Sequence, residues 1–473
     1  MRLDALLGRL DDQPATLSPP GAGETEITTI VHDTRDVVPG ALFCCVPGAH
    51  VDGHDLASRA VELGAAALLV ERPVGAGVPE VRVPRVRDAL GPVAGAFWDH
   101  PSRSMRVIAV TGTSGKTTTT HLLAAILEAH GWPTAVIGTL SGPRTTPEAP
   151  ELQGRLAAER DAGRTAVAME VSSHSLSLGR VRATKFSLAI FTNLSHDHLD
   201  FHRNMDDYFA AKAALFTPAY TQAAVVNLDD PRGQELAGRG LVPTEGYSLD
   251  DAEDLEVAST RSRFRWRGAT VEVPMGGRFN VSNAVAAATA AARLGIDTQT
   301  IAAGLAAAQP VPGRFEPIDE GQPFAVIVDY SHKPAALAGA LDAARSTAAG
   351  GKVILVFGAG GDRDASKRSM MGEVAGRGAD RVLLTSDNPR GEDPLAIIAA
   401  VHAGIPPTAT CTVEPDRATA IALAIGEAQP GDVVLIAGKG HESVQIVGEQ
   451  TIPFDDREVA RTALRVRRDG RGW

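Results

Sequence analysis

The sequence predicts an α/β protein whose parallel sheets are divided among three domains. A chain of 473 residues is too long for one hydrophobic core, and domains of roughly 100–200 residues are usual. Short apolar runs alternate with helical patterns, as in βαβ units. Aromatic residues make up only 4% of the chain, and Ala, Val, Leu and Ile fill most apolar positions. This composition favours parallel sheets wrapped by alanine-rich helices over an aromatic-cored sandwich.

The first domain is expected to span residues 1–100 as a small α/β unit. Short apolar runs at Ala41–Phe43 and Ala65–Val70 are separated by Gly/Pro turns. The domain is expected to end at Asp99–Ser102, because the residue before Pro101 is disfavoured in a helix.

The second domain is expected to span residues 101–314 around a parallel sheet. The run Val107–Val110 precedes a glycine-rich turn and a helical stretch from Lys116 to His130. Three further buried strands are expected at Ala166–Val171, Leu188–Thr192 and Ala223–Asn227. The acidic segment Asp250–Asp254 is interpreted as a solvated loop.

The third domain is expected to span residues 315–473, after a hinge at Pro312–Arg314. Its apolar runs, each expected to precede a helix, predict a Rossmann-like doubly wound sheet. These runs are Ala325–Val328, Val353–Phe357, Arg381–Leu384 and Val433–Ala437.

Composition excludes several classes of function and location. The net charge of −11 and pI near 5.7 argue against nucleic-acid binding, which needs a basic face. Cys44, Cys45 and Cys411 have no metal-ligand spacing, which favours a reducing compartment. The N-terminus makes a poor signal peptide, and no run of 18 strongly apolar residues predicts a membrane span. We therefore expect a cytoplasmic protein without membrane insertion.

The strongest chemical motif is Thr111–Thr117, placed between a strand and a helix. Its glycines let successive N–H groups point at phosphate oxygens, and the helix N-terminus adds its positive end. Lys116 is expected to bridge the outer phosphates, and the Thr117 hydroxyl to hold Mg²⁺. This predicts a central P-loop ATPase domain, with ATP bound by Gly112, Thr113, Ser114, Gly115, Lys116, Thr117 and Thr118. The loop alone does not separate a ligase from a kinase, GTPase or motor.

Ten further motifs follow in order along the chain and together resemble the Mur ligase family. They are Thr145–Glu148, Glu170–His174, Thr192–Asp200, Tyr208–Lys212, Phe279–Asn283, Gly313–Glu316, Asp329–His332, Gly360–Asp364, Asp387–Arg390 and Gly438–Glu442. The resemblance covers nearly the whole chain, including Asp33–Arg35 in a uridine-nucleotide domain.

The resemblance implies an ATP- and Mg²⁺-dependent ligase that activates a carboxylate as an acyl phosphate and couples it to an amino acid. Within the family it points to the members that add the third residue of the peptidoglycan stem. The implied substrates are UDP-MurNAc-L-Ala-D-Glu and meso-diaminopimelate, and the implied state is a monomer.

Four residues are expected to carry the catalysis: Lys116, Glu170, His198 and Lys212. Glu170, at the end of a predicted strand, and His198 have the ligand chemistry for a second Mg²⁺. Lys212 lies on an apolar helix from Tyr208 to Phe216, where position alone favours a lysine that reaches out to solvent. The resemblance instead implies that Lys212 is carbamylated and joins Thr117, Glu170 and His198 as a metal ligand.

The resemblance also assigns the remaining contacts. For ATP these are Asn283, Arg314, Asp329 and His332, with Arg314 beside the hinge. For the nucleotide-peptide acceptor they are Asp33, Thr34, Arg35, Thr145, Thr146, Ser172 and Arg180.

For the incoming amino acid the implied residues are Arg363, Asp387, Asn388, Arg390, Gly438 and Glu442. Locally, Asp387–Arg390 reads as a turn. In relatives the same string marks enzymes that add diaminopimelate rather than lysine, and Arg390 can pair with the second carboxylate that lysine lacks. Open alternatives are a sibling ligase that adds lysine or another amino acid, a folylpolyglutamate-type ligase, and a P-loop phosphotransferase or regulator. The Thr-Thr-Pro-Glu and Asp-Asn-Pro-Arg segments disfavour the folate branch, and a regulator is expected to have lost some of the four catalytic residues.

Overall fold

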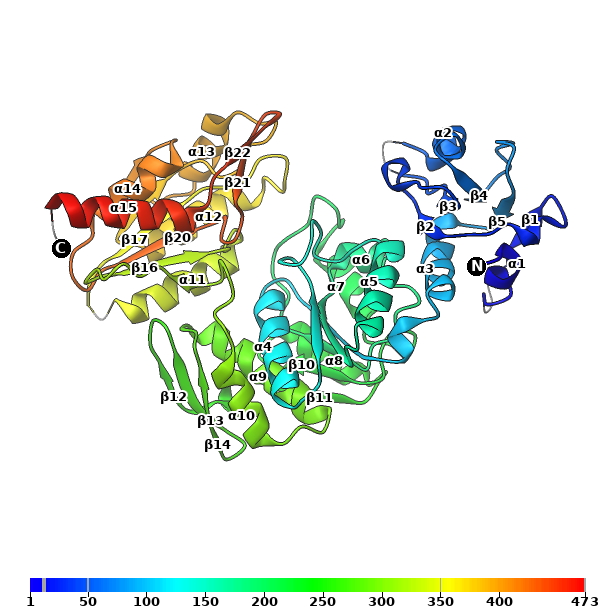
Figure 1. The fold of residues 1–473 in the computed structure, drawn as a ribbon. Coiled ribbons are helices and arrows are strands. Elements are labelled where there is room, and N and C mark those ends of the chain that lie inside the picture. The colour runs from blue at the N-terminus through cyan, green and yellow to red at the C-terminus, as the bar shows by residue number, and fades with distance from the viewer. Residues whose placement is uncertain (11–13, 49–50, 349, 472–473) are drawn as a thin grey trace.

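The computed structural model describes residues 1–10, 14–48, 51–348 and 350–471. Each of the ranges 1–100, 101–314 and 315–473 contains one larger sheet, which is mixed or parallel. The second range also contains a three-stranded antiparallel sheet, and the third a two-stranded one. Figure 1 shows three lobes, with the N-terminal and C-terminal lobes at opposite ends of the central one. The predicted α/β class with parallel sheets is confirmed.

The N-terminal lobe holds a five-stranded sheet of order β1-β5-β4-β3-β2, in which only β1 runs antiparallel to its neighbour. Its elements are α1 (Leu3–Leu7), β1 (Thr16–Ser18), η1 (Ala22–Glu24), β2 (Thr29–Val31), η2 (Thr34–Asp36), β3 (Ala41–Cys44), η3 (Gly53–Leu56), α2 (Ala57–Glu62), β4 (Ala65–Val70), β5 (Glu80–Arg82) and α3 (Val86–Phe97).

The central lobe is built on a parallel six-stranded sheet of order β11-β10-β9-β6-β8-β7. Its elements are η4 (Pro101–Arg103), β6 (Arg106–Thr111), α4 (Lys116–Ala129), β7 (Thr134–Ile137), α5 (Ala149–Asp161), β8 (Ala166–Glu170), α6 (Ser173–Ser177), β9 (Leu188–Phe191), α7 (Met205–Ala213), β10 (Ala224–Asn227), α8 (Pro231–Arg239), β11 (Thr244–Tyr247), η5 (Leu249–Asp251), β12 (Glu253–Val257), β13 (Ser262–Trp266), β14 (Ala269–Val273), α9 (Arg278–Arg293) and α10 (Thr298–Ala307).

The C-terminal lobe has a six-stranded sheet of order β15-β16-β20-β17-β18-β19, parallel except for β15. Its elements are β15 (Glu316–Pro317), β16 (Ala325–Asp329), α11 (Pro334–Thr347), β17 (Val353–Phe357), α12 (Lys367–Gly378), β18 (Arg381–Leu384), α13 (Pro394–His402), β19 (Cys411–Val413), α14 (Arg417–Glu427), β20 (Val433–Ala437), β21 (Val444–Val447), β22 (Gln450–Pro453) and α15 (Asp456–Arg471).

Two expectations about the chain are wrong. The acidic segment Asp250–Asp254 is not a loop, because its first half belongs to η5 and Glu253–Val257 forms β12 of an antiparallel sheet. Buried residues alternate along the two neighbouring strands β13 and β14, so this sheet covers part of the core. The expected helix directly after Val433–Ala437 is also wrong, since the hairpin β21–β22 precedes α15.

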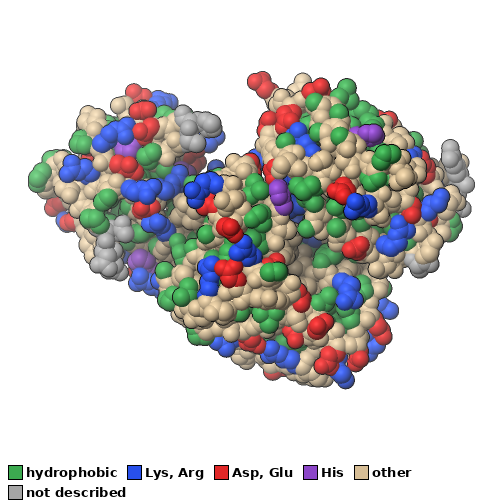
Figure 2. Space-filling model, turned by 180° about the vertical axis from the view of Figure 1, so that it is seen from behind, with side chains coloured by type: hydrophobic (Ala, Val, Ile, Leu, Met, Phe, Trp, Pro, Cys, Tyr) green, Lys and Arg blue, Asp and Glu red, His purple; other side chains and the backbone are tan. Residues whose placement is uncertain are grey.

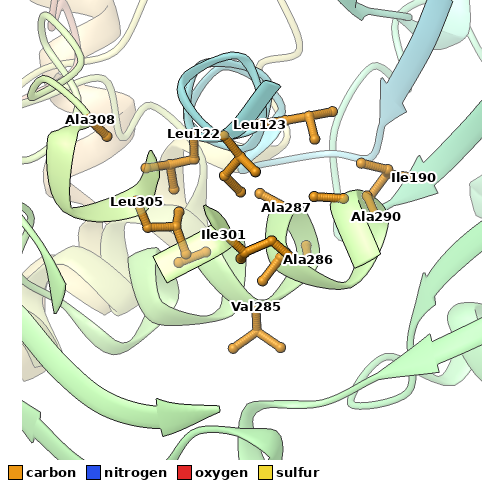
Figure 3. Close-up of a cluster of buried hydrophobic side chains, with 14 of the residues drawn as sticks. Leu122, Leu123, Ile190, Val285, Ala286, Ala287, Ala290, Ile301, Leu305 and Ala308 are labelled. Atoms are coloured by element: carbon orange, nitrogen blue, oxygen red, sulfur yellow. The ribbon is translucent and has the colours of Figure 1, made fainter. Parts of the chain in front are cut away.

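The largest core cluster places one helix of the central lobe against the phosphate-loop helix. Figure 3 shows Leu122 and Leu123 of α4 packed with alanines of α9 and with Ile301 and Leu305 of α10. A methyl group on Gly304 of α10 would lie 2.6 Å from the Cα atom of Ile126, so the two helices meet at backbone distance. The alanines of α9 likewise let that helix lie against α4, where Asn283 accepts a hydrogen bond from the Thr119 hydroxyl at 3.3 Å.

No helix within residues 1–10, 14–48, 51–348 and 350–471 combines the length and apolarity required to cross a bilayer.

Candidate active site

The predicted phosphate loop joins β6 to α4 and needs glycine at two positions. Gly112 and Gly115 have φ angles of 149° and 85°, which other residues rarely adopt. A Cβ atom on Gly112 would lie 1.9 Å from the Thr192 hydroxyl, and one on Gly115 would lie 2.4 Å from the Asn283 amide oxygen. The loop is therefore fixed from two sides, by the segment after β9 and by α9.

Lys116 folds back over this loop. Its Nζ atom donates to the carbonyl oxygens of Gly112 and Thr113, at 3.0 and 3.2 Å. Burial and the ammonium group of Lys333 lower the pKa of Lys116 to about 8, although Glu170 and Asp197 partly oppose them. An anion placed at the loop would stabilise the charged form of Lys116.

A cavity of about 590 Å³ opens above the loop, and we call it the nucleotide pocket. The residues predicted to contact ATP line the nucleotide pocket, with the exception of Gly112. The lining includes Thr113, Ser114, Gly115, Lys116, Thr117, Thr118, Asn283, Arg314, Asp329 and His332.

The third lobe contributes one side of the nucleotide pocket through the segment after the hinge. Arg314 donates to the Thr117 hydroxyl at 2.9 Å, and its guanidinium lies 4.4 Å from the centre of the Tyr330 ring. Asp329 accepts hydrogen bonds from the backbone of Phe315 at 2.7 Å and of Ser331 at 2.9 Å. Asp329 thus holds the two ends of this segment together, and its predicted contact with ribose or phosphate stays a prediction.

Glu170 and His198 have the donor chemistry expected of Mg²⁺ ligands. Glu170 is 2% exposed and accepts from the Thr139 backbone at 2.8 Å and the Thr139 hydroxyl at 3.2 Å. Burial lowers the pKa of His198 to about 2, so its imidazole is neutral at pH 7 and keeps a lone pair. With the buried Thr117 hydroxyl, these groups fit a hard cation that takes its remaining ligands from phosphate and water.

Lys212 lies inside the molecule, so the interpretation as a lysine that reaches solvent is wrong. It is 1% exposed on α7, and its Nζ atom donates to the Gly112 carbonyl at 2.8 Å. The same atom lies 4.7 Å from the centre of the Tyr208 ring. Burial and the nearby ammonium groups of Lys116 and Lys333 hold the pKa of Lys212 well below its usual range. Burial therefore favours the neutral amine form of Lys212 beside the phosphate loop.

A second cavity of about 660 Å³ lies against the first. We call it the acceptor-amine pocket, after the incoming amino acid whose amine is predicted to attack the activated acceptor. Its lining includes the six residues predicted for the incoming amino acid, Arg363, Asp387, Asn388, Arg390, Gly438 and Glu442. We call the residues that line both cavities the shared wall: Thr139, Thr145, His198, Tyr330 and His332. A reaction that joins a ligand of one cavity to a ligand of the other would occur at this wall.

Buried polar contacts orient the side chains of the acceptor-amine pocket. The Asn388 amide oxygen accepts from Lys439 at 3.2 Å and from the Ile446 backbone at 3.0 Å, so the amide nitrogen points to Glu442, 2.7 Å away. Arg390 has a φ of 52° and donates to the Gly361 carbonyl at 2.7 Å. The pocket thus holds the Glu442 carboxylate, which Asn388 and Lys439 already contact, beside the N–H groups of Asn388 and Arg390.

The residues predicted for the nucleotide-peptide acceptor are divided between two places. Thr145 is on the shared wall, and the Thr146 hydroxyl donates to the Glu170 carbonyl at 3.0 Å, next to Ser172 at 3.4 Å. Arg180 lies 2.8 Å from Glu148, so its guanidinium is already paired with a carboxylate. Asp33, Thr34 and Arg35 lie at η2 of the N-terminal lobe and do not line either cavity.

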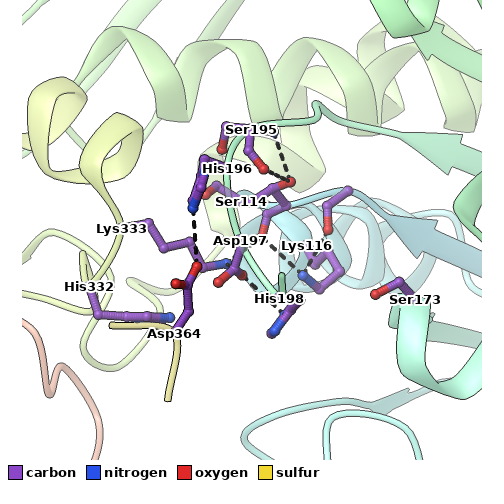
Figure 4. Close-up of polar contacts among 12 residues, drawn as sticks. Ser114, Lys116, Ser173, Ser195, His196, Asp197, His198, His332, Lys333 and Asp364 are labelled. Atoms are coloured by element: carbon purple, nitrogen blue, oxygen red, sulfur yellow. Dashed lines mark hydrogen bonds and ion pairs between the residues drawn. The ribbon is translucent and has the colours of Figure 1, made fainter. Parts of the chain in front are cut away.

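Sequence reasoning missed three charged residues at the junction of the lobes. Lys333, at the start of α11, lies 2.8 Å from the carboxylate of Asp197 and donates to the Thr113 carbonyl at 3.0 Å (Figure 4). Lys367, at the start of α12, lines the acceptor-amine pocket. Lys333 directly follows the His332 motif and Asp197 directly precedes His198, and that adjacency was the only signal available in the sequence.

The two outer lobes leave a hollow above the central lobe when the molecule is viewed from behind (Figure 2). Polar contacts cross between the central and third lobes beside it. They include the two of Lys333 and those of His196 with Asp364 at 3.1 Å and with Ser366 at 3.2 Å, while Arg314 at the hinge donates to Thr117.

Comparisons with known proteins agree with this geometry. Models of the Mur ligase middle domain, the Mur ligase glutamate ligase domain and the Mur ligase family catalytic domain match residues 110–291, 313–440 and 26–98. A UDP-N-acetylmuramoyl-L-alanyl-D-glutamate–2,6-diaminopimelate ligase of Streptomyces coelicolor is 45% identical, over 97% of this chain and 96% of its own length. The ligase of the same name from Geobacillus kaustophilus is 45% identical, over 94% of this chain and 96% of its own. A solved structure with that name is 31% identical, with a TM-score of 0.68 over 99% of both chains.

Proposed function

This chain belongs to the Mur ligase family, and from that premise we propose that it joins meso-diaminopimelate to UDP-MurNAc-L-Ala-D-Glu at the expense of ATP. The observation that carries the proposal is the shared wall between the nucleotide pocket and the acceptor-amine pocket. It provides one place where a triphosphate, a carboxylate and an amine can meet. The proposed role is a step of peptidoglycan synthesis.

The chemistry takes place in two steps. First, a carboxylate oxygen of the acceptor bonds to the γ-phosphorus of ATP, and ADP leaves with the electron pair of the broken P–O bond. Second, the amine nitrogen attacks the carbonyl carbon of the acyl phosphate, phosphate leaves with the electron pair of the C–O bond, and the nitrogen loses a proton to solvent. Bringing a carboxylate to a polyphosphate concentrates negative charge, so the main task of the protein is to neutralise it.

The phosphate loop and Lys116 are proposed to bind the β- and γ-phosphates. Thr117, Glu170 and His198 would hold Mg²⁺, which neutralises phosphate charge when bound. His198 suits this role because a neutral imidazole can ligate a cation, whereas an imidazolium cannot. Arg314, at the hinge that leads into the third lobe, donates to Thr117 and so links the nucleotide site to the position of the hinge.

We propose that Lys212 is carbamylated in the active enzyme. A neutral amine adds to carbon dioxide, and the depressed pKa of Lys212 supplies that neutral form. The carbamate, formed with loss of a proton from nitrogen, would be an anion beside the ammonium groups of Lys116 and Lys333. Intact-protein mass spectrometry under bicarbonate would detect the added group.

Meso-diaminopimelate is proposed over lysine because of the charges in the acceptor-amine pocket. Glu442 can pair with an ammonium group, while Arg390 and Asn388 can donate to a carboxylate. Lysine would leave Arg390 without its anion, and a polar group left without a partner in a binding pocket discriminates strongly. Arg363, Asp387 and Gly438 complete the pocket.

The three ranges 1–100, 101–314 and 315–473 are proposed to bind the uridine nucleotide, ATP and the amino acid. For the first, Asp33, Thr34 and Arg35 would contact the UDP part, while Thr145, Thr146, Ser172 and Arg180 hold the peptide end. With substrates that are all small and soluble, the proposed setting is the cytoplasm and the proposed state a monomer.

The test of this function supplies the purified protein with ATP, Mg²⁺ and UDP-MurNAc-L-Ala-D-Glu, and compares meso-diaminopimelate with L-lysine as the amine. We expect ADP, phosphate and a tripeptide product with meso-diaminopimelate, and little product with lysine. Preference for lysine would contradict the role of Arg390 and leave the ligase chemistry standing. ATP consumption without any amide product would contradict the ligase function itself.

A further inference from the structure

Two lysines of the third lobe stand at the junction of the cavities, with no role among the nucleotide and amino-acid contacts described above. Lys333 and Lys367 are each 7% exposed; Lys333 immediately precedes α11, and Lys367 is the first residue of α12. Burying a lysine without an anionic partner is costly, so such a residue marks a place where an anion is expected.

Lys333 already has partners, and all of them belong to the central lobe. Its Nζ atom lies 2.8 Å from the Asp197 carboxylate and 3.0 Å from the Thr113 carbonyl oxygen. Lys116 donates to the same Thr113 carbonyl at 3.2 Å. The Thr113 carbonyl oxygen therefore accepts hydrogen bonds from two lysines, one from each lobe. Lys116 and Lys333 lie side by side (Figure 4).

Lys367 differs, because within the described part of the chain its ammonium has no hydrogen-bond or ion-pair partner. It lines the acceptor-amine pocket together with Asp197, His198 and His332, near the shared wall. Asp197, Asp364 and Asp387 attract it over longer distances, while Lys333 repels it. Burial lowers the pKa of Lys367, and a nearby anion would favour its charged form.

Cations and carboxylates both gather at this junction. Asp197 pairs with Lys333, and Asp197 and Glu170 attract Lys116. Asp364 and Asp387 attract Lys367 without pairing with it, so among the described residues Lys367 is the lysine whose charge is left for a bound anion. His332, on the shared wall between them, adds no charge, because burial and the two lysines hold its pKa well below its usual range.

We propose that Lys333 and Lys367 form an anion cradle for the phosphoryl group as it passes from ATP to the acceptor carboxylate. The proposal rests on the function proposed above and assigns the third lobe a part in the first chemical step, beyond binding the amino acid. Lys333 faces the nucleotide pocket and Lys367 the acceptor-amine pocket, so the two stand on opposite sides of the shared wall. Acyl phosphate would then form only when the third lobe has closed on the central lobe.

The first step can be measured alone with hydroxylamine in place of the amino acid. Hydroxylamine attacks the acyl phosphate and yields a hydroxamate, so its rate reports phosphoryl transfer without the acceptor-amine pocket being filled. We expect Lys367→Met to lower the hydroxamate rate by about 100-fold or more, as loss of a group that stabilises transition-state charge does. Lys367→Arg should restore much of the rate, and the KM for meso-diaminopimelate should stay near that of the wild type.

Lys333→Met leaves the Asp197 carboxylate without its cation, so the double variant Lys333→Met/Asp197→Asn is measured with it. Both should lose hydroxamate formation while still binding a non-hydrolysable ATP analogue, which shows that the fold and the nucleotide pocket persist. Lys352→Met removes a charge from an exposed position of the same lobe and should leave the rate unchanged. If Lys367→Met fails to fold, Lys367→Gln replaces it in the same assay.

A wild-type hydroxamate rate in Lys367→Met, together with a raised KM for meso-diaminopimelate, would overturn the cradle and assign Lys367 to the amino-acid carboxylate. An undiminished rate in the Lys333 variants would overturn it as well. If the wild-type protein itself forms neither hydroxamate nor amide, the proposed function fails, so the two failures are distinguishable.

Discussion

The nucleotide pocket and the acceptor-amine pocket are similar in size but are built in different ways. The floor of the nucleotide pocket is one short stretch, residues 113–117, placed between a strand and a helix of one lobe. The specificity side of the acceptor-amine pocket comes from separate segments after β17, β18 and β20, whose side chains orient one another. A binding site made of one continuous backbone stretch is expected to fail abruptly when altered, whereas a site made of cooperating side chains should change its selectivity first.

The largest effect is expected at the nucleotide floor. Lys116→Ala should lower kcat/KM by roughly 10³-fold or more, because it removes a cation aimed at the developing phosphate charge. Steady-state release of phosphate with all three substrates measures this. Near-normal turnover of the variant would contradict a role of the phosphate loop in catalysis. It would also contradict the expected difference between the two pockets.

A smaller and more selective effect is expected at Arg390. Arg390→Ala should cut the preference for meso-diaminopimelate over lysine by roughly ten- to hundred-fold, since a hydrogen bond to a charged group contributes about 1.5–3 kcal/mol. The kcat/KM values for the two amines give the ratio, and the KM for ATP should not move. An equal loss for both amines would show that Arg390 supports the pocket without reading the second carboxylate.

The smallest effect concerns pH. In the free protein the pKa of Lys116 is lowered to about 8, so raising the pH through 8 removes its charge. Bound phosphates favour the charged form, so affinity for an ATP analogue should be full below pH 8 and fall by at most about tenfold per unit above it. Titration calorimetry between neutral and alkaline pH measures this fall. The same fall in Lys116→Met would assign the titration to another group.

Sequence patterns predicted the parts of the molecule whose causes are local. The strand, glycine turn and helix around Lys116 are contiguous, and the structure has helix α4 beginning at that residue, as expected. The parallel strands at Ala166, Val353 and Val433 are apolar runs that need no distant partner to be recognised.

Tertiary placement was not predictable in the same way. On its apolar helix Lys212 reads in sequence as a lysine that reaches solvent, yet packing of α7 buries it beside the phosphate loop. Lys333 and Lys367 acquire their importance only because another lobe lies against them. The acidic segment Asp250–Asp254 resembles a loop because β12, which begins within it, is partly exposed and carries charges.

The central claim is that an acyl phosphate forms at the wall shared by the two pockets. Its most direct test uses UDP-MurNAc-L-Ala-D-Glu whose reacting glutamate carboxylate carries an oxygen isotope label, with ATP, Mg²⁺ and meso-diaminopimelate. The account predicts that one labelled oxygen leaves with each phosphate released, because the carboxylate oxygen becomes the bridge to phosphorus. Phosphate free of label, with amide product formed, would contradict it.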